Sequence, residues 1–142
     1  MKFWDTSAIV PLLADEPGRL SLLASVEADP VMFVWWGTPV ECMSAVARRE
    51  REGTMSIVAA TSAAERLRKL SHAWHEVLPG EQLRGLAQRL LRVHPLRAAD
   101  SLQLAAAILA AEHDPARLVF VCLDTRLAQA ASREGFDVRG AE

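Results

Sequence analysis

Four carboxylates lie in stretches of the sequence where ionised side chains are uncommon. The chain has 18 Asp and Glu residues, and most of them have charged or polar neighbours, as in Glu50-Arg51-Glu52. Four are instead flanked by apolar and small residues, namely Asp5, Glu41, Asp100 and Asp124. Removing an ionised group from water costs several kcal/mol unless a partner compensates for the lost hydration. These four side chains therefore call for a common explanation.

Carboxylates that gather at one place repel one another unless a cation lies between them. No Lys stands directly beside any of the four acids. A site made only of carboxylate oxygens favours hard divalent ions, so Mg²⁺ or Mn²⁺ fits it better than zinc or copper. The residue types therefore predict a site for Mg²⁺ or Mn²⁺.

Strands and helices alternate along the predicted chain. Continuous apolar runs predict strands at Lys2–Asp5, Val31–Trp35, Leu118–Leu123 and Phe136–Val138. Apolar periodicity and end signals predict helices at Ala8–Ala14, Arg19–Glu27, Thr38–Glu52, Ser56–Ala73, Glu81–Val93, Ala98–Glu112 and Thr125–Glu134. This alternation predicts an α/β sandwich with a central parallel sheet, formed by residues 1–142 as a single domain.

The four acids are predicted to fall at one edge of that sheet. In open α/β folds, ligands bind beyond the carboxyl ends of the strands. Asp5 and Asp124 lie at the ends of predicted strands, whereas Glu41 and Asp100 lie in the first turn of predicted helices. The positive ends of those helices offset part of the repulsion between the acids. One acidic cluster is therefore geometrically reasonable.

The same acids also suit a purely structural interpretation as helix caps. Thr38-Pro39-Val40-Glu41 has the form of a capping box, with Thr as the N-cap and Glu three residues later. Asp5 and Asp124 precede predicted helices as N-caps do, and Asp100 suits the positive end of its helix. Each acid taken alone favours capping. A metal site is favoured by all four together, because capping does not require them to share one edge.

Composition limits the classes of partner. Hydrophobic residues make up 51% of the 142-residue chain, which is enough for a packed core. The net charge of −2 gives no general attraction to nucleic acid, so a polyanion would need local Arg residues or bound metal. No apolar stretch reaches the ~20 residues of a membrane span, and the first residues lack the form of a signal peptide. We expect a cytoplasmic protein without membrane contact, whose Cys42 and Cys122 are reduced core thiols.

Other catalytic signatures are absent. The sequence contains no GxxxxGK[ST] phosphate loop, no GxGxxG fingerprint and no GxSxG elbow. His72 and His75 stand three apart at a predicted helix end, but no second pair of ligands accompanies them, so we interpret them as solvated. Trp35-Trp36 either offers a stacking surface for bases or packs in a core or dimer contact.

Four segments carry a resemblance to a known family. They are Phe3-Trp4-Asp5-Thr6-Ser7-Ala8, Glu41 at the start of a helix, His94–Ala105 with Asp100 in its middle, and Phe120–Ala128 with Asp124. In order and spacing the chain resembles PIN-domain ribonucleases of the VapC type, the toxin components of bacterial toxin–antitoxin pairs. The resemblance covers nearly the whole chain and implies a PIN-like three-layer α/β/α sandwich with a central, mainly parallel sheet.

The resemblance implies roles for the acids and their neighbours. Asp5, Asp100 and Asp124 would bind one or two Mg²⁺ or Mn²⁺ ions, directly or through water, and Glu41 would complete the site. The implied reaction is metal-dependent hydrolysis of RNA phosphodiesters that leaves 5′-phosphate and 3′-hydroxyl ends.

Neighbouring residues would support this site. Thr6 or Ser7 would orient Asp5 or a bound water by hydrogen bonding, and Arg97 would either steer phosphate or pair with the acids. One departure from the family pattern is Cys122, because relatives often carry Ser or Thr before the last acid. It puts a supporting hydrogen bond in doubt.

The resemblance also implies partners. Toxins of this type form homodimers and are inhibited by a small cognate antitoxin whose tail lies across the acidic groove. The chain shows no DNA-binding element of its own, so DNA would be contacted only through the antitoxin. RNA is the implied substrate.

Two alternative functions stay open. The first is an aspartyl phosphotransferase or phosphatase with Asp5 as the nucleophile at the end of the first strand. Such enzymes use a second Asp two residues later, where this chain has Ser7. The second is a catalytically silent PIN-like module that binds RNA or protein. The presence of all four acids argues against it.

Overall fold

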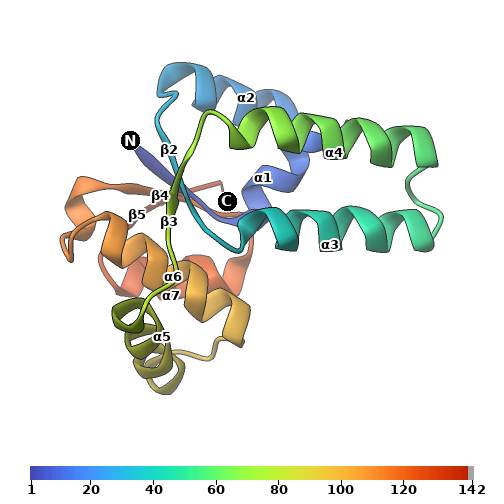
Figure 1. The fold of residues 1–142 in the computed structure, drawn as a ribbon. Helices are drawn as coiled ribbons and strands as arrows, with labels where there is room; N and C mark the ends of the chain where they lie inside the picture. The colour runs from blue at the N-terminus through green and yellow to red at the C-terminus, as the bar shows by residue number, and fades with distance from the viewer. Residues whose placement is uncertain (141–142) are drawn as a thin grey trace.

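The computed structural model describes residues 1–140, which form a five-stranded sheet with helices on both faces (Figure 1). The strand order is β3-β2-β1-β4-β5, and every neighbouring pair is parallel. The strands are β1 (Lys2–Trp4), β2 (Met32–Trp35), β3 (His75–Val77), β4 (Val119–Val121) and β5 (Asp137–Arg139). The predicted parallel sheet is therefore present.

Within residues 1–140, seven α-helices cover the sheet. They are α1 (Thr6–Leu13), α2 (Arg19–Ala28), α3 (Thr38–Arg51), α4 (Ile57–Ser71), α5 (Glu81–Val93), α6 (Ala98–Ala110) and α7 (Thr125–Arg133), with a short 3₁₀ helix at Pro115–Arg117. Helices α1 to α4 pack on one face and α5 to α7 on the other, so the molecule has three layers (Figure 1). Within residues 1–140, no helix has the length and apolar character needed to cross a membrane.

The strands β1, β2 and β4 supply both cores, because successive side chains point to opposite faces of a sheet. In β1, Phe3 packs under α5 to α7, whereas Trp4 packs under α1 to α4. Phe120 and Val121 divide in the same way in β4, and the rings of Phe3 and Phe120 stack 5.4 Å apart. Burial on both faces explains why these strands are continuous apolar runs in the sequence.

One strand was missed by the sequence analysis. β3 has no apolar run, because His75 and Glu76 are exposed, and it lies at the edge of the sheet beside β2. The interpretation of His75 as part of a helix end is therefore wrong. Its ring packs on Phe33 of β2 with centroids 5.2 Å apart, whereas His72 does end α4.

The strand order places a crevice where the site was expected. The chain builds the sheet outward from β1 through β2 to β3 on one side, and from β4 to β5 on the other side. The direction of strand addition therefore reverses between the neighbouring strands β1 and β4. Ligands of open α/β folds bind outside the carboxyl ends of the strands at such a switch point. Asp5 follows β1 directly and Asp124 lies three residues after β4, so both belong to this end of the sheet.

The core beneath α6 allows a test of the fold. Leu104 is fully buried, so Leu104→Ala is expected to lower the free energy of unfolding by about 2–5 kcal/mol, through lost burial and an unfilled cavity. Urea unfolding measures this change. Leu20→Ala is the matched control, because Leu20 is 80% exposed on α2 and its truncation should change stability little. Equal effects of the two substitutions would contradict the packing described.

Candidate functional site

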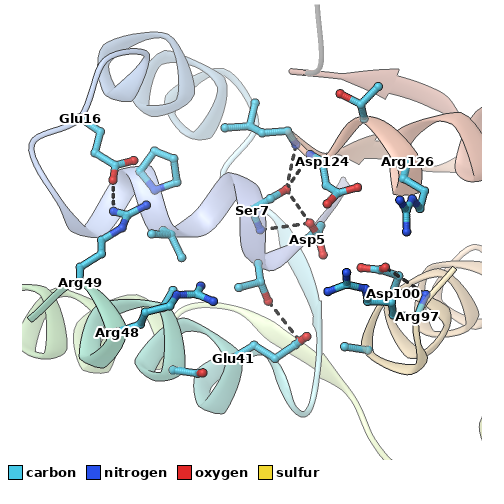
Figure 2. Close-up of a pocket in the computed structure, with 18 residues that line it drawn as sticks. Asp5, Ser7, Glu16, Glu41, Arg48, Arg49, Arg97, Asp100, Asp124 and Arg126 are labelled. Carbon is cyan, nitrogen blue, oxygen red and sulfur yellow. Dashed lines mark hydrogen bonds and ion pairs between the residues drawn. The ribbon is translucent and has the colours of Figure 1, made fainter. Parts of the chain in front are cut away.

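An open pocket of about 940 Å³ lies beyond the carboxyl ends of β1 and β4 (Figure 2). It brings together every residue singled out from the sequence, namely Asp5, Thr6, Ser7, Glu41, Arg97, Asp100 and Asp124. The four acids come from four different places in the chain, at the starts of α1, α3, α6 and α7. The pocket also contains Glu16 and the arginines Arg48, Arg49 and Arg126, which the sequence analysis did not single out.

Asp5 is held by the start of α1. It is 5% exposed, and its backbone N–H donates to the Val121 carbonyl of β4 at 3.0 Å. Its Oδ2 accepts hydrogen bonds from the Ser7 backbone N–H at 3.0 Å and the Ser7 hydroxyl at 2.6 Å. The predicted N-cap is therefore present. Within residues 1–140 the Oδ1 atom accepts no hydrogen bond, so capping occupies only one carboxylate oxygen.

Ser7 joins the ends of the two central strands. While its hydroxyl donates to Asp5, the same oxygen accepts from the backbone N–H groups of Leu123 at 2.8 Å and Asp124 at 3.2 Å. One small side chain thus fixes the Asp5 carboxylate and the backbone that carries Asp124. Of the two hydroxyls considered in the sequence analysis, Ser7 is the one that contacts Asp5.

Glu41 is not part of the predicted capping box. Gly37, rather than Thr38, is the N-cap of α3, and within residues 1–140 no side chain caps this helix end by a hydrogen bond. Glu41 instead turns toward Thr6, whose hydroxyl donates to its Oε2 atom at 3.2 Å. Gln103 of α6 donates to the same oxygen at 2.7 Å. These two donors hold Glu41 at the pocket.

Gln103 is a residue whose role the sequence analysis missed. It is 1% exposed, and its Nε2 atom lies 2.7 Å from Glu41, 3.0 Å from Thr6 and 3.1 Å from Thr38. The amide has two N–H groups, so these three acceptors share two hydrogens. Its signal in the sequence is a polar residue three positions after Asp100 in a mainly apolar helix, which places both on one face.

Asp100 and Asp124 also combine capping with access to the pocket. The Asp100 Oδ2 atom accepts from the Arg97 backbone N–H at 3.3 Å. The Asp124 Oδ1 atom accepts from the Leu127 backbone N–H at 2.9 Å, which makes it the N-cap of α7. Helix capping therefore explains part of the sequence pattern, and it does not compete with the clustering of the acids.

Burial and mutual repulsion disfavour ionisation in the pocket. Burial is the main cause that raises the pKa of Asp5, Glu41 and Asp100. Neighbouring acids raise these pKa values further, as Asp100 does for Asp5 and Asp124 does for Asp100. Hydrogen bonds from Ser7 and Gln103 lower the pKa of Asp5 and Glu41 in part. The pocket thus concentrates negative charge that a cation would stabilise.

The cysteine that departs from the family pattern lies beside this network. The buried Cys122 thiol is 3.6 Å from Asp5 Oδ2 and 3.4 Å from the Asp124 carbonyl oxygen. A thiol is a weak donor, so it makes a weaker contact than a hydroxyl would. Both cysteines are free and buried, and burial raises the pKa of Cys42 to about 12. These are unreactive thiols.

The carboxylates are not already arranged as a closed metal cage. Within residues 1–140, no three His, Cys, Asp or Glu side chains are grouped so that they could hold one ion. Their chemistry nevertheless fits Mg²⁺, which commonly keeps several waters and uses only one or two protein carboxylates. The uncapped Oδ1 atom of Asp5, and the neighbouring acids that help to raise the pKa of Asp5, Glu41 and Asp100, agree with a site that a cation would stabilise.

Comparisons with known proteins establish the fold. No protein-family model and no curated protein sequence matches the chain. A chain from a toxin–antitoxin complex of Klebsiella pneumoniae superposes with a TM-score of 0.68 at 17% identity, over 100% of this chain and 98% of that one. A chain of FitAcB from Neisseria gonorrhoeae has a TM-score of 0.68 at 18% identity, over 99% and 98%. The predicted three-layer α/β/α sandwich is confirmed.

The raised pKa values predict how stability depends on pH. Above the ordinary Asp pKa of 3.8, the folded protein keeps a proton on Asp100 that the unfolded chain loses, until pH passes the raised folded value. Through this window the native state binds more protons, so the free energy of unfolding falls as pH rises. Asp100→Asn removes this contribution. We expect the variant to gain stability over wild type as pH rises from below that ordinary value to neutrality, measured by urea unfolding.

Asp137→Asn is a control for which the opposite change in stability at neutral pH is expected. A hydrogen bond from Arg139 lowers the pKa of Asp137, so this carboxylate contributes stability at neutral pH that is lost as pH falls through its folded pKa. Asp137→Asn should therefore lose stability relative to wild type at neutral pH. A neutral-pH loss for Asp100→Asn like that of Asp137→Asn would contradict the electrostatics described for the pocket.

Proposed function

We propose that this protein is a metal-dependent endoribonuclease of the PIN-domain, VapC type, and the toxin component of a toxin–antitoxin module. One observation carries the proposal: four carboxylates from four separate helix starts share one pocket at the switch point of the sheet. A set of helix caps would not need to converge in this way. The fold shared with a chain of a toxin–antitoxin complex supports the same assignment.

The residues that would hold Mg²⁺ or Mn²⁺ are Asp5, Asp100 and Asp124, directly or through water, with Glu41 completing the set. Bound there, the ion would lower the pKa of a water molecule and neutralise charge that develops on the phosphate. The protein's part is positioning. Ser7 fixes the Asp5 carboxylate, and Gln103 with Thr6 fixes that of Glu41. The proposed reaction is in-line hydrolysis of a phosphodiester in single-stranded or looped RNA.

Cleavage of a defined RNA set tests the proposal. We expect purified protein to cut RNA with Mg²⁺ or Mn²⁺ and not with EDTA. Asp5→Asn and Asp100→Asn should each lower the rate by at least about 100-fold, because even residues that only support metal ligands typically contribute about 10- to 100-fold. Asn also caps helices well, so Asp5→Asn should preserve the start of α1. Gel analysis of the products measures the rate and the end groups.

Two outcomes would contradict the nuclease proposal. Equal cutting by wild type and both variants would show that the activity belongs to a contaminant. Metal binding without cutting of any RNA would favour the silent binding module.

The phosphotransferase alternative has no support from the site. Such enzymes carry a second Asp two residues after the nucleophile, whereas here that position is Ser7, whose hydroxyl donates a hydrogen bond to Asp5.

Metal binding should also stabilise the fold. A ligand that binds only the native state at about 100 times its Kd adds about 2.7 kcal/mol to the free energy of unfolding. Millimolar Mn²⁺ is therefore expected to raise the Tm of wild type and to have much less effect on Asp5→Asn, as measured by thermal melting. Asp137→Asn, which removes an exposed carboxylate outside the pocket, should keep the full response. An unchanged Tm of wild type would count against a metal site.

The proposed partners are a cognate antitoxin and a second copy of this chain. The antitoxin segment would cover the acidic pocket, and any DNA contact would belong to the antitoxin. A homodimer is supported by exposed apolar side chains at the start of α3, where Trp36, Val40 and Met43 are 51%, 72% and 38% exposed. Apolar surface of this kind is typical of protein–protein contacts.

A further inference from the structure

Within residues 1–140, three of the pocket's arginines form no ion pair although carboxylates lie near them. Four arginines line the pocket. Arg49 forms an ion pair with Glu16. Within residues 1–140, the other three, Arg48, Arg97 and Arg126, form no ion pair with any acid. Their guanidinium groups therefore stay available to an anion that enters the pocket.

These three arginines stand on two sides of the acids. Arg48 belongs to α3, Arg97 precedes α6, and Arg126 belongs to the first turn of α7. Figure 2 shows Arg48 on one side, and Arg97 with Arg126 on the other, with Asp5 and Glu41 between them. The arrangement places positive charge at both ends of a negatively charged centre.

The arginines of a neighbouring pocket are engaged, unlike Arg48, Arg97 and Arg126. A second pocket of about 650 Å³ adjoins the first through Glu16 and Arg49. Its other arginine, Arg66, donates to the Leu13 carbonyl at 3.1 Å and lies 3.6 Å from Asp15. Both of its arginines are thus engaged, so an extended anion gains little by entering it.

We infer that Arg48, Arg97 and Arg126 bind backbone phosphates on either side of the phosphodiester that lies over the acids. A single RNA strand would cross the pocket from Arg48 on α3 to Arg97 and Arg126. This inference rests on the proposed function for its ligand. A guanidinium fork matches two phosphate oxygens, and a chain of net charge −2 needs such local cations to attract a polyanion.

Salt-dependent binding tests the inference without relying on cleavage. The protein carries Asp5→Asn to prevent turnover, and its affinity for a fluorescein-labelled single-stranded RNA is measured by anisotropy with Mg²⁺ over a series of salt concentrations. Arg48→Gln, Arg97→Gln and Arg126→Gln should each weaken binding about tenfold, as expected for the loss of a charged hydrogen bond. Each should also reduce the slope of log affinity against log salt by about 0.7, the value for one phosphate contact on a single strand.

Arg89→Gln is the matched control. Arg89 is exposed on α5, does not line the pocket, and forms no ion pair within residues 1–140, so its loss removes the same charge elsewhere. Its affinity and salt slope should stay close to those of the parent. Circular dichroism checks that all variants are folded. In otherwise wild-type protein, Arg48→Gln and Arg126→Gln should raise KM more than they lower kcat.

The outcomes separate this inference from the nuclease proposal. If Arg48→Gln, Arg97→Gln and Arg126→Gln bind RNA as Arg89→Gln does, or if the parent binds no RNA, the inference is wrong. If RNA is cleaved at a rate that does not depend on these arginines, the nuclease proposal is supported and the inference is wrong. If binding depends on the arginines but the wild-type protein never cuts RNA, the inference is supported and the nuclease proposal is wrong.

Discussion

The hydroxyl of Ser7 is the contact on which the arrangement of the pocket depends. It donates to the Asp5 carboxylate and accepts two backbone N–H groups from the segment that follows β4. The ends of the two central strands are thereby fixed relative to each other. Asp5 and Asp124 can face one pocket because this hydroxyl satisfies polar groups from both sides, in a region where unsatisfied groups are costly. A side chain that cannot both donate and accept, such as that of Ala, could not make these contacts.

The pocket has acidic side chains at its centre and arginines around them. The acids at its centre are partly desolvated, and burial with mutual repulsion raises the pKa of three of them. Within residues 1–140, Arg48, Arg97 and Arg126 lie beyond ion-pair distance of these acids, although the charges of Arg97 and Arg126 lower the pKa of Asp100 in part. Direct pairing would have neutralised the cluster and left no ligands for a cation. The separation keeps both kinds of charge available, the acids for a metal ion and the arginines for a polyanion.

The sequence predicted the position of the acids better than it predicted their contacts. Asp5 and Asp124 could be placed because buried strands have apolar runs whose ends are easy to recognise. The capping-box alternative for Glu41 came from the local form Thr-Pro-x-Glu, whereas one of its partners in the structure, Gln103, lies 62 residues away in the chain. β3 was missed because an exposed edge strand has no apolar run. Arg48 and Arg126 could not be found, because a sequence does not show which arginines lack a carboxylate partner.

The pocket lies on the seam between the two helical layers. Glu41 and Arg48 come from α3 in one layer, whereas Asp100 and Asp124 come from α6 and α7 in the other. Gln103 already connects the two layers, since it donates hydrogen bonds from α6 to Thr6 of α1 and Glu41 of α3. A ligand that contacts both layers would be a second connection between them. Occupancy of the pocket would then resist sliding of one layer over the other, and so stiffen the molecule at a distance from the site itself.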